Sequence, residues 1–348
     1  MQQRWKRRPE GSNWGDFGPD DQLGRVNLIT REKLLQGVAE VREGISFCLS
    51  LPLDLPGSNR LNPRRYPPRR FATLRGGKQN FNFPLRSENP NHTDVVCDET
   101  VLLYTQYSTQ WDSFAHIGSL FDADGDGVPE PVFYNGWRSG EHVVSAAERG
   151  DAEDWACFEG VEAKALGIET MAVACVQGRA VLIDLHAHFG RERKLVGYDD
   201  LMRVCEMDRV TVEPGDMVCL HTGFGEALIE MKGDPDPHFL HNACAALDGR
   251  DPHLLQWITD SGLTILAADN YAVEALPSRE PDTSHAHAAM PIHEHCLFKL
   301  GVHLGELWYL TDLAAFLRRC GRSRFLLTAP PLRLPGAVGS PATPVATV

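Results

Sequence analysis

The chain has 348 residues, of which 43% are hydrophobic and 23% charged, a composition that can fill a large core and excludes an intrinsically disordered protein. Its formal charge of −13 argues against nucleic acid or an anionic membrane as a partner, since both bind basic surfaces. The nine cysteines are scattered without a Cys-x-x-Cys pair, and no secretory signal or membrane-spanning apolar run stands out, so we expect a cytoplasmic protein with reduced thiols.

Residues 1–44 are expected to form an N-terminal arm and a helix. Thr30 can cap a helix over 31–43 that would end at Gly44. Its buried stripe would consist of Leu34, Leu35, Val38 and Val41. Residues 45–51 alternate as a half-buried strand. The stretch 54–84 is rich in proline, asparagine and arginine and predicts a long irregular loop, which we interpret as wrapping a neighbouring subunit.

The remaining elements alternate between apolar β-prone runs and helical patterns. Strands are predicted at 171–176, 180–185, 217–221, 263–268 and 324–328. Helices are predicted at 199–207, 252–261, 291–300 and 312–319. This mixture indicates an α/β fold with a mixed sheet, in one catalytic domain over 45–329. The proline-rich end, 330–348, would be an extended tail that packs on this chain or crosses to another subunit.

Four polar side chains stand at regular offsets after the β-prone run 100–105: Gln106, Gln110, Asp112 and His116. On an extended chain they would face one way, although residues 113–116 could equally open a helix. Either geometry lets the aspartate and the histidine converge. The flanking Trp111 and Phe114 are candidates for an apolar pocket that receives an aromatic or cyclic substrate.

This segment resembles the signature of the putative cyclase family, which includes bacterial kynurenine formamidase and isatin hydrolase. The family pattern is His-x3-His-x-Asp-x3-His, so Asp112 and His116 match it while Gln106 and Gln110 replace its first two histidines. The segments 13–30, 212–223 and 268–306 resemble the longer branch of the same family, so the likeness covers most of the chain. It implies a swivelling β/β/α fold that usually assembles as a homodimer or homotetramer.

The resemblance also implies the remaining site residues. His293 and Glu306 would join Asp112 as metal ligands, and His116 would be the acid/base. An ion can acidify a water and polarise a carbonyl, and a histidine can protonate a leaving nitrogen. With two glutamines, an oxygen-rich set suits manganese or magnesium better than tetrahedral zinc. The predicted function is hydrolysis of a cyclic or N-acyl carbon–nitrogen bond in a formamide, lactam or imide, of the arylformamidase or isatin hydrolase type.

Two alternatives stay open from the residues. In a metal-independent cyclase, lactonase or dehydratase, Asp112 would orient His116 and Glu306 would be a second proton-transfer group. Gln106 and Gln110 would then donate hydrogen bonds to the substrate carbonyl. The other alternative is a non-catalytic protein that binds a small molecule.

Three further clusters have simpler interpretations. Residues 122–127 match the first half of a calcium loop, but position 12 is Phe133, so a solvated turn is the better interpretation. His186 and His188 have the spacing of a metal pair on a strand, although a polar strand end or subunit contact explains them better. Asp269 and Asn270 end a predicted strand, where they could cap a turn or serve function.

Overall fold

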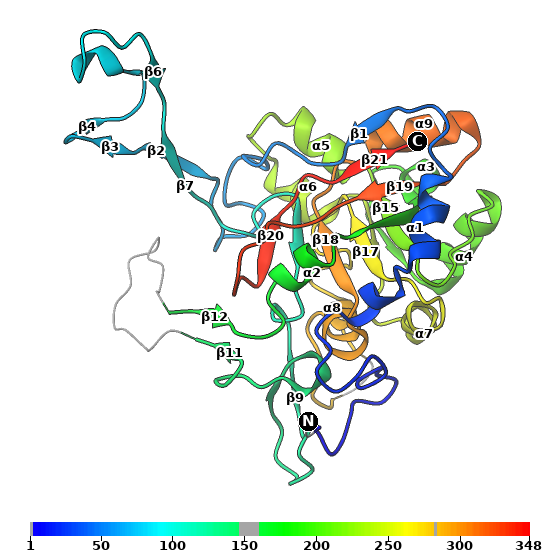
Figure 1. Cartoon of the computed structure of the whole chain (residues 1–348). Coiled ribbons are helices and arrows are strands. Elements are labelled where there is room, and N and C mark those ends of the chain that lie inside the picture. The colour runs from blue at the N-terminus through cyan, green and yellow to red at the C-terminus, as the bar shows by residue number, and fades with distance from the viewer. Residues whose placement is uncertain (1–2, 146–159, 282–283) are drawn as a thin grey trace.

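The computed structural model describes residues 3–145, 160–281 and 284–348, and its centre is a nine-stranded sheet (Figure 1). The strand order is β1–β21–β19–β13–β15–β17–β18–β8–β20. The strands are β1 (Ser46–Cys48), β8 (Gln110–Asp112), β13 (Gln177–Asp184), β15 (Met217–His221), β17 (Ile265–Ala268), β18 (His303–Glu306), β19 (Arg324–Thr328), β20 (Gly339–Pro341) and β21 (Val345–Thr347). The neighbouring pairs among β13, β15, β17 and β18 are parallel, and the other neighbouring pairs of the sheet are antiparallel. The predicted mixed α/β sheet is therefore confirmed.

Helices cover both faces of the sheet. Since side chains alternate along a strand, Leu220 packs on one face and Cys219 on the other. The first face carries α4 (Tyr198–Met207), α7 (Pro252–Asp260), α8 (Pro291–His293) and the π-helical segment η4 (Glu294–Leu300). The second face carries α2 (Glu169–Val173) and α9 (Thr311–Cys320). Residues of the central parallel strands are buried on both sides, which explains their continuous apolar sequence.

Short elements complete the fold. The remaining helices are α1 (Arg31–Val38), α3 (Leu185–Phe189), α5 (Phe224–Glu230) and α6 (Pro237–Asn242), with 3₁₀ turns η1 (Gly24–Leu28), η2 (Leu85–Ser87) and η3 (Tyr134–Gly136). Small strand pairs are formed by β9 (Ser119–Phe121) with β10 (Glu130–Val132), β11 (Val143–Val144) with β12 (Glu162–Ala163), and β14 (Lys194–Val196) with β16 (Ala245–Leu247). No helix of the described residues is long and apolar enough to cross a membrane. The eight cysteines that the structure describes are free.

An arm of short antiparallel strands extends away from the body (Figure 1). It contains β2 (Arg69–Ala72), β3 (Leu74–Arg75), β4 (Lys78–Gln79), β5 (Phe83–Pro84), β6 (Val95–Val96) and β7 (Glu99–Leu102). β2 pairs with β7 and β5 with β6, so the prediction of an irregular loop over 54–84 is wrong for its second half. The pairing partners lie beyond that stretch, where its local composition carries no information about them.

The N-terminal helix is shorter than predicted and buries a different side of its surface. Thr30 caps it as predicted, accepting a hydrogen bond from the backbone nitrogen of Lys33. However, α1 ends at Val38, and the predicted buried residue Leu35 is 56% exposed. Gly37 and Lys33 are buried instead. The helix approaches β13 so closely that a Cβ on Gly37 would lie 2.7 Å from the backbone nitrogen of Arg179, which excludes a larger residue from the contact.

One further segment differs from its prediction, and the end of the chain follows the first of its two alternatives. Residues 169–173 form α2 rather than the predicted strand, because a short apolar run does not by itself distinguish a strand from a buried helix. The segment 330–348 is extended, but it supplies β20 and β21 to the sheet of its own chain. β21 pairs with both β1 and β19, so the end of the chain is part of the core sheet.

Candidate active site

Three ionisable side chains from distant segments meet at one edge of the sheet. β8 and β18 pair antiparallel, which places Gln110 opposite Glu306 and Asp112 opposite Leu304. His293 comes from the end of α8. One ligand atom each from Asp112, His293 and Glu306 lies within 4.8 Å of the others, and all three residues are buried. The structure therefore brings together the three residues that sequence analysis proposed as metal ligands.

His293 is held between two buried carboxylates. Its Nδ1 lies 2.8 Å from Oε1 of Glu274, and its Nε2 lies 3.1 Å from Oε1 of Glu306. Burial alone would lower the pKa of His293, but the hydrogen bonds and charges of the two glutamates raise it to about 10. His293 is thus an imidazolium that donates a hydrogen bond from each ring nitrogen.

Glu274 is a site residue that sequence analysis missed. Its carboxylate also accepts hydrogen bonds from the backbone nitrogens of Ile292 (3.0 Å) and His293 (2.9 Å), so it fixes both the ring and the start of α8. Its side chain has no solvent exposure. The available signal was a single acid within the apolar run 271–276, since a charge buried among apolar residues needs a partner.

The two carboxylates of the cluster differ electrostatically. Burial acts to raise the pKa of Glu306, but the hydrogen bond and charge of His293 outweigh it, so this pKa lies below its usual range. Burial raises the pKa of Asp112, and the neighbouring charge of Glu306 adds to the increase. Glu306 therefore carries the firm negative charge, and Asp112 takes up a proton more readily.

The two glutamines bond to the ionisable residues rather than facing open space. The side-chain amide of Gln106 donates to Oδ1 of Asp112 (3.2 Å) and lies 2.9 Å from Nδ1 of His116. Because an amide nitrogen only donates, Nδ1 of His116 accepts and the ring proton lies on Nε2. Gln110 donates to Oε2 of Glu306 (3.0 Å). These glutamine N–H groups therefore hold the side chains of Asp112, His116 and Glu306 in place.

His116 is the most accessible member of the group. Its side chain is 20% exposed, whereas Asp112 has no exposure, and its Nε2 lies 3.9 Å from Oδ1 of Asp112. That separation is longer than a hydrogen bond, so the expected direct orientation of His116 by Asp112 is replaced by a bridge through Gln106. His116 lies in a turn after β8, neither on the strand nor in a helix.

A small cavity adjoins Gln106 and has room for about one water molecule, roughly 10 Å³. Arg65, from the arginine-rich stretch, lines it and donates to the backbone oxygen of Gln106 (2.7 Å). Across the cavity, Asn62 donates to the hydroxyl of Tyr271 (3.0 Å), and burial raises the pKa of that phenol. Arg65 thus reaches the site from a segment that sequence analysis interpreted mainly as a subunit contact.

The cluster fits a hard divalent cation. Oδ2 of Asp112 and Oε1 of Gln110 are buried, and no described residue gives them a hydrogen bond. The carboxylates of Asp112 and Glu306 lie together, and His293 would join them as a ligand once its Nε2 proton is released. Gln110, which bonds to Glu306, would add its amide oxygen. Such an oxygen-rich donor set suits manganese or magnesium better than zinc. The buried unpartnered oxygens are the observation that carries this fit, because buried polar atoms normally have partners.

Trp111 and Phe114, the candidate substrate-contacting residues, lie in the core. Trp111 donates its indole N–H to the backbone oxygen of Ala329 (2.8 Å) and packs edge-on against Trp308. Phe114 stacks on His303 with ring centroids 3.9 Å apart. Neither Trp111 nor Phe114 has any exposed surface, so as placed they offer nothing to a substrate. Trp111 points away because side chains alternate along β8.

The predicted histidine pair does not form a metal group within the described part of the chain. β13 ends at Asp184, so His186 and His188 lie in the short helix α3 rather than on a strand. Nε2 of His188 bonds to Asp208 (2.9 Å), and Asp184 bonds instead to His221 (2.8 Å). The helical spacing separates the two imidazoles that a strand would have placed on one face.

The remaining two clusters act as turns. Asp122 accepts hydrogen bonds from the backbone nitrogens of Gly125 and Gly127, and it pairs with Arg7. Its neighbours Asp124 and Asp126 lie near it, but this exposed loop satisfies its carboxylates through its own backbone. Asp269 caps the turn after β15 by accepting from the backbone nitrogens of residues 222 and 223.

Comparisons with known proteins agree with the fold and show the family. A family model described as "Putative cyclase" matches residues 49–275. The crystal structure of a novel cyclase is 28% identical, with 97% of each chain covered and a TM-score of 0.72. Isatin hydrolase A from Ralstonia solanacearum is 12% identical, covers 90% of this chain and 94% of its own, and has a TM-score of 0.52.

A further solved structure, isatin hydrolase A from Labrenzia aggregata bound to benzyl benzoate, is 11% identical. It covers 90% of this chain and 97% of its own, with a TM-score of 0.52. At this identity, the two isatin hydrolases indicate a shared fold. No protein with a curated function matches the chain.

Proposed function

The chain belongs to the putative cyclase family, and from that premise we propose that it hydrolyses a cyclic or N-acyl carbon–nitrogen bond, as in a formamide, lactam or imide. The observation that carries the proposal is the meeting of a partly exposed imidazole, His116, with the buried group Asp112, His293 and Glu306. Such a group supplies proton transfer next to a charged, water-poor pocket, which hydrolysis of an amide requires.

The chain's own residues have separable roles. In its doubly protonated form, His116 would donate a proton from Nε2, the nitrogen opposite the Gln106 bridge, to the leaving nitrogen and return to the neutral ring. Glu306 is ionised before the reaction and would accept a proton from the attacking water. Asp112 and Gln106 hold His116 in place, and Glu274 holds His293.

We propose that a divalent cation, manganese or magnesium rather than zinc, binds Asp112, His293 and Glu306 with help from the carbonyl oxygen of Gln110. When bound, it would acidify a water and polarise the substrate carbonyl. To bind it, His293 would release its Nε2 proton while Glu274 keeps Nδ1–H in place. This arrangement makes Glu274 a positioning residue for the ligand nitrogen.

One observation favours a second candidate, a metal-independent cyclase, lactonase or dehydratase. Gln106 and Gln110 occupy the positions of the first two histidines in the family pattern. Their side-chain amides bond to the ionisable residues Asp112, His116 and Glu306. That network positions an acid and a base without further ligands. A silent small-molecule binder is the third candidate, and turnover of any compound removes it.

The test is a screen of formamides, lactams, imides and lactones with the full chain purified without a nickel column. We expect turnover of a carbon–nitrogen substrate, stimulated by Mn²⁺ and lost on chelation. Asp112→Asn should abolish it, whereas Asp126→Asn, which removes a charge from an exposed turn, should not. Turnover that survives chelation with less than about a tenth of an equivalent of divalent metal bound would refute the metal-assisted reaction and favour the second candidate.

We also propose that the chain assembles as a homodimer or homotetramer through its arm. The arm exposes large hydrophobic side chains that a single copy leaves in water: Phe71, Leu74, Phe81, Val95, Val101 and Leu102. Such side chains are typical of a surface that a partner covers. Light scattering should give a mass of two or four chains, lowered by Leu74→Glu; a monomeric mass for the native protein would contradict the proposal.

A further inference from the structure

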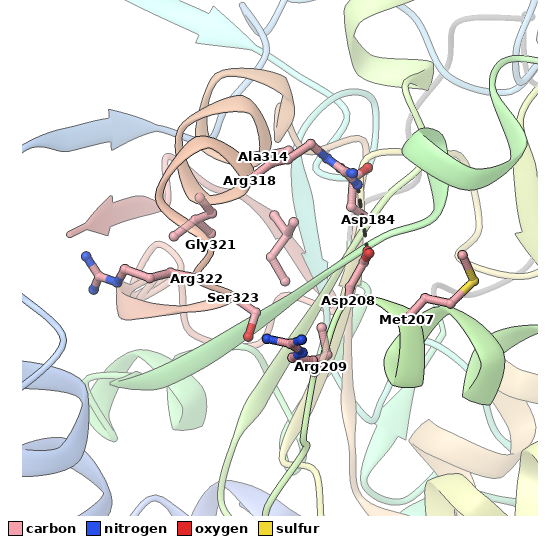
Figure 2. Close-up of a pocket in the computed structure, with 12 residues that line it drawn as sticks. Asp184, Met207, Asp208, Arg209, Ala314, Arg318, Gly321, Arg322 and Ser323 are labelled. Carbon is pink, nitrogen blue, oxygen red and sulfur yellow. Dashed lines mark hydrogen bonds and ion pairs between the residues drawn. The ribbon is translucent and has the colours of Figure 1, made fainter.

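A pocket of about 360 Å³ opens between β13, the end of α4 and α9 (Figure 2). It shares no lining residue with the catalytic cluster. Leu182 of β13 lines it and packs in the core layer of α9, whereas Leu304, whose strand position shares a face with Glu306, packs in the other layer. The pocket is therefore separate from the candidate active site.

The pocket combines an apolar wall with arginines. Its apolar lining consists of Leu182, Val210, Ala314 and Leu317. Its charged lining consists of Arg209, Arg318, Arg322, Asp184 and Asp208. The volume lies at the lower end of the range typical of small-molecule sites. An apolar wall with an excess of guanidinium groups suits a small organic anion.

Two of the three arginines are already neutralised. Figure 2 shows the Arg318 guanidinium between two carboxylates, 2.8 Å from Asp184 and 3.7 Å from Asp208. Arg322 pairs with Glu43 at 2.8 Å. Each of these guanidiniums therefore has a structural partner that explains its presence.

Arg209 has no such partner. No described residue forms a hydrogen bond or ion pair with its guanidinium, and it points toward Ser323 along the wall of the pocket (Figure 2). The Ser323 hydroxyl likewise has no hydrogen-bond partner among the described residues. Arg209 and Ser323 thus leave donors directed at the same space, above the apolar wall.

The backbone of Arg209 adopts a left-handed conformation that favours glycine. α4 ends at Met207 with Asp208 as its C-cap, and Arg209 follows in the left-handed region with φ of 53°. The backbone nitrogen of Val210 then bonds to the oxygen of Cys205 at 2.7 Å, which is the helix-ending turn that favours glycine at this position. An arginine there is less stable than glycine, and because Arg209 is exposed its guanidinium can reach a ligand in the pocket.

We propose that this pocket binds a small carboxylate with an apolar body. Arg209 would bind the carboxylate through paired N–H donors, and the Ser323 hydroxyl would donate to it from the side. The leucine, valine and alanine side chains would cover the apolar body. The ligand would sit apart from the catalytic residues, as an effector rather than a reacting group.

The test is isothermal titration of the full chain with benzoate at neutral pH and constant salt. We expect saturable binding that weakens by about tenfold or more in Arg209→Gly, since a charge-assisted hydrogen bond is lost. The matched control is Lys232→Gly, because Lys232 is also an exposed cation in the left-handed region after a helix, α5, but lies outside the pocket. It should bind benzoate like the native protein.

The thermal midpoint of Arg209→Gly should equal or exceed the native one, because glycine suits the left-handed backbone. Weaker binding then reports the lost guanidinium and not unfolding. Benzyl alcohol and inorganic phosphate should each bind at least about tenfold more weakly than benzoate, since one lacks the charge and the other the apolar body. Absence of benzoate binding, equal binding in Arg209→Gly, or phosphate binding as tight as benzoate would each overturn the proposal.

Discussion

The charge on His293 should depend on Glu274, and Glu274→Gln tests this directly. Glu274 is fully buried and accepts from Nδ1 of His293 at 2.8 Å, as well as from the backbone nitrogens of Ile292 and His293. Glutamine has the same size as glutamate but no charge. Its NH₂ group cannot accept a hydrogen bond, so one of the two backbone N–H groups would lose its acceptor. Removing an adjacent opposite charge lowers a histidine pKa by about 1–3 units. The pKa of His293 should fall from about 10 by that amount.

The same change should alter stability in a pH-dependent way. Because the folded pKa of His293 is raised above 6.5, its contribution to the free energy of unfolding is complete below pH 6.5 and is lost as pH rises through about 10. At about 1.4 kcal/mol per unit, the variant should lose about 1–4 kcal/mol near neutral pH. This difference should shrink toward pH 10, where the native imidazole also becomes neutral.

The assay is an NMR titration of the imidazole carbons in the presence of a chelator, with urea unfolding at pH 7 and 9. Glu294→Gln is the control. It also removes a carboxylate charge, one residue from His293, but the Glu294 side chain bonds to Ser119 and not to His293. It should leave the His293 titration unchanged. A native His293 that titrates near 6.5, or the same pKa in Glu274→Gln as in the native protein, would refute the two-carboxylate account.

Three further outcomes follow from the structure. His116→Ala should abolish turnover of any substrate found while leaving the circular dichroism spectrum unchanged; full activity would remove His116 from the mechanism. Gln106→His combined with Gln110→His should raise Mn²⁺ affinity in an equilibrium titration, and no gain in bound metal would show that the site geometry differs from the family's. Gly24→Ala should lower the free energy of unfolding by about 3 kcal/mol in urea, because Gly24 has φ of 53° and its new Cβ would meet the backbone of Gly301; native stability would contradict this close contact.

Local pattern determined much of the fold. The strands at 217–221 and 324–328 have the predicted bounds, and α4 and α7 differ from prediction by one residue at one end. These segments are long or strongly apolar, so their own residues decide their conformation. The buried face of α1 was predicted wrongly, because it depends on how closely the helix approaches β13.

For the site, the sequence by itself supplied Asp112, His116, His293 and Glu306 through a family resemblance, and the structure brings the three proposed ligands together. Only the tertiary structure showed that Glu274 lies beside His293. It also placed Trp111 in the core, where the side chain has no exposed surface for a substrate to contact. The physical reason is the same in each case. A buried charge is stabilised by partners distant in the chain, and spacing along the sequence does not specify which segments meet.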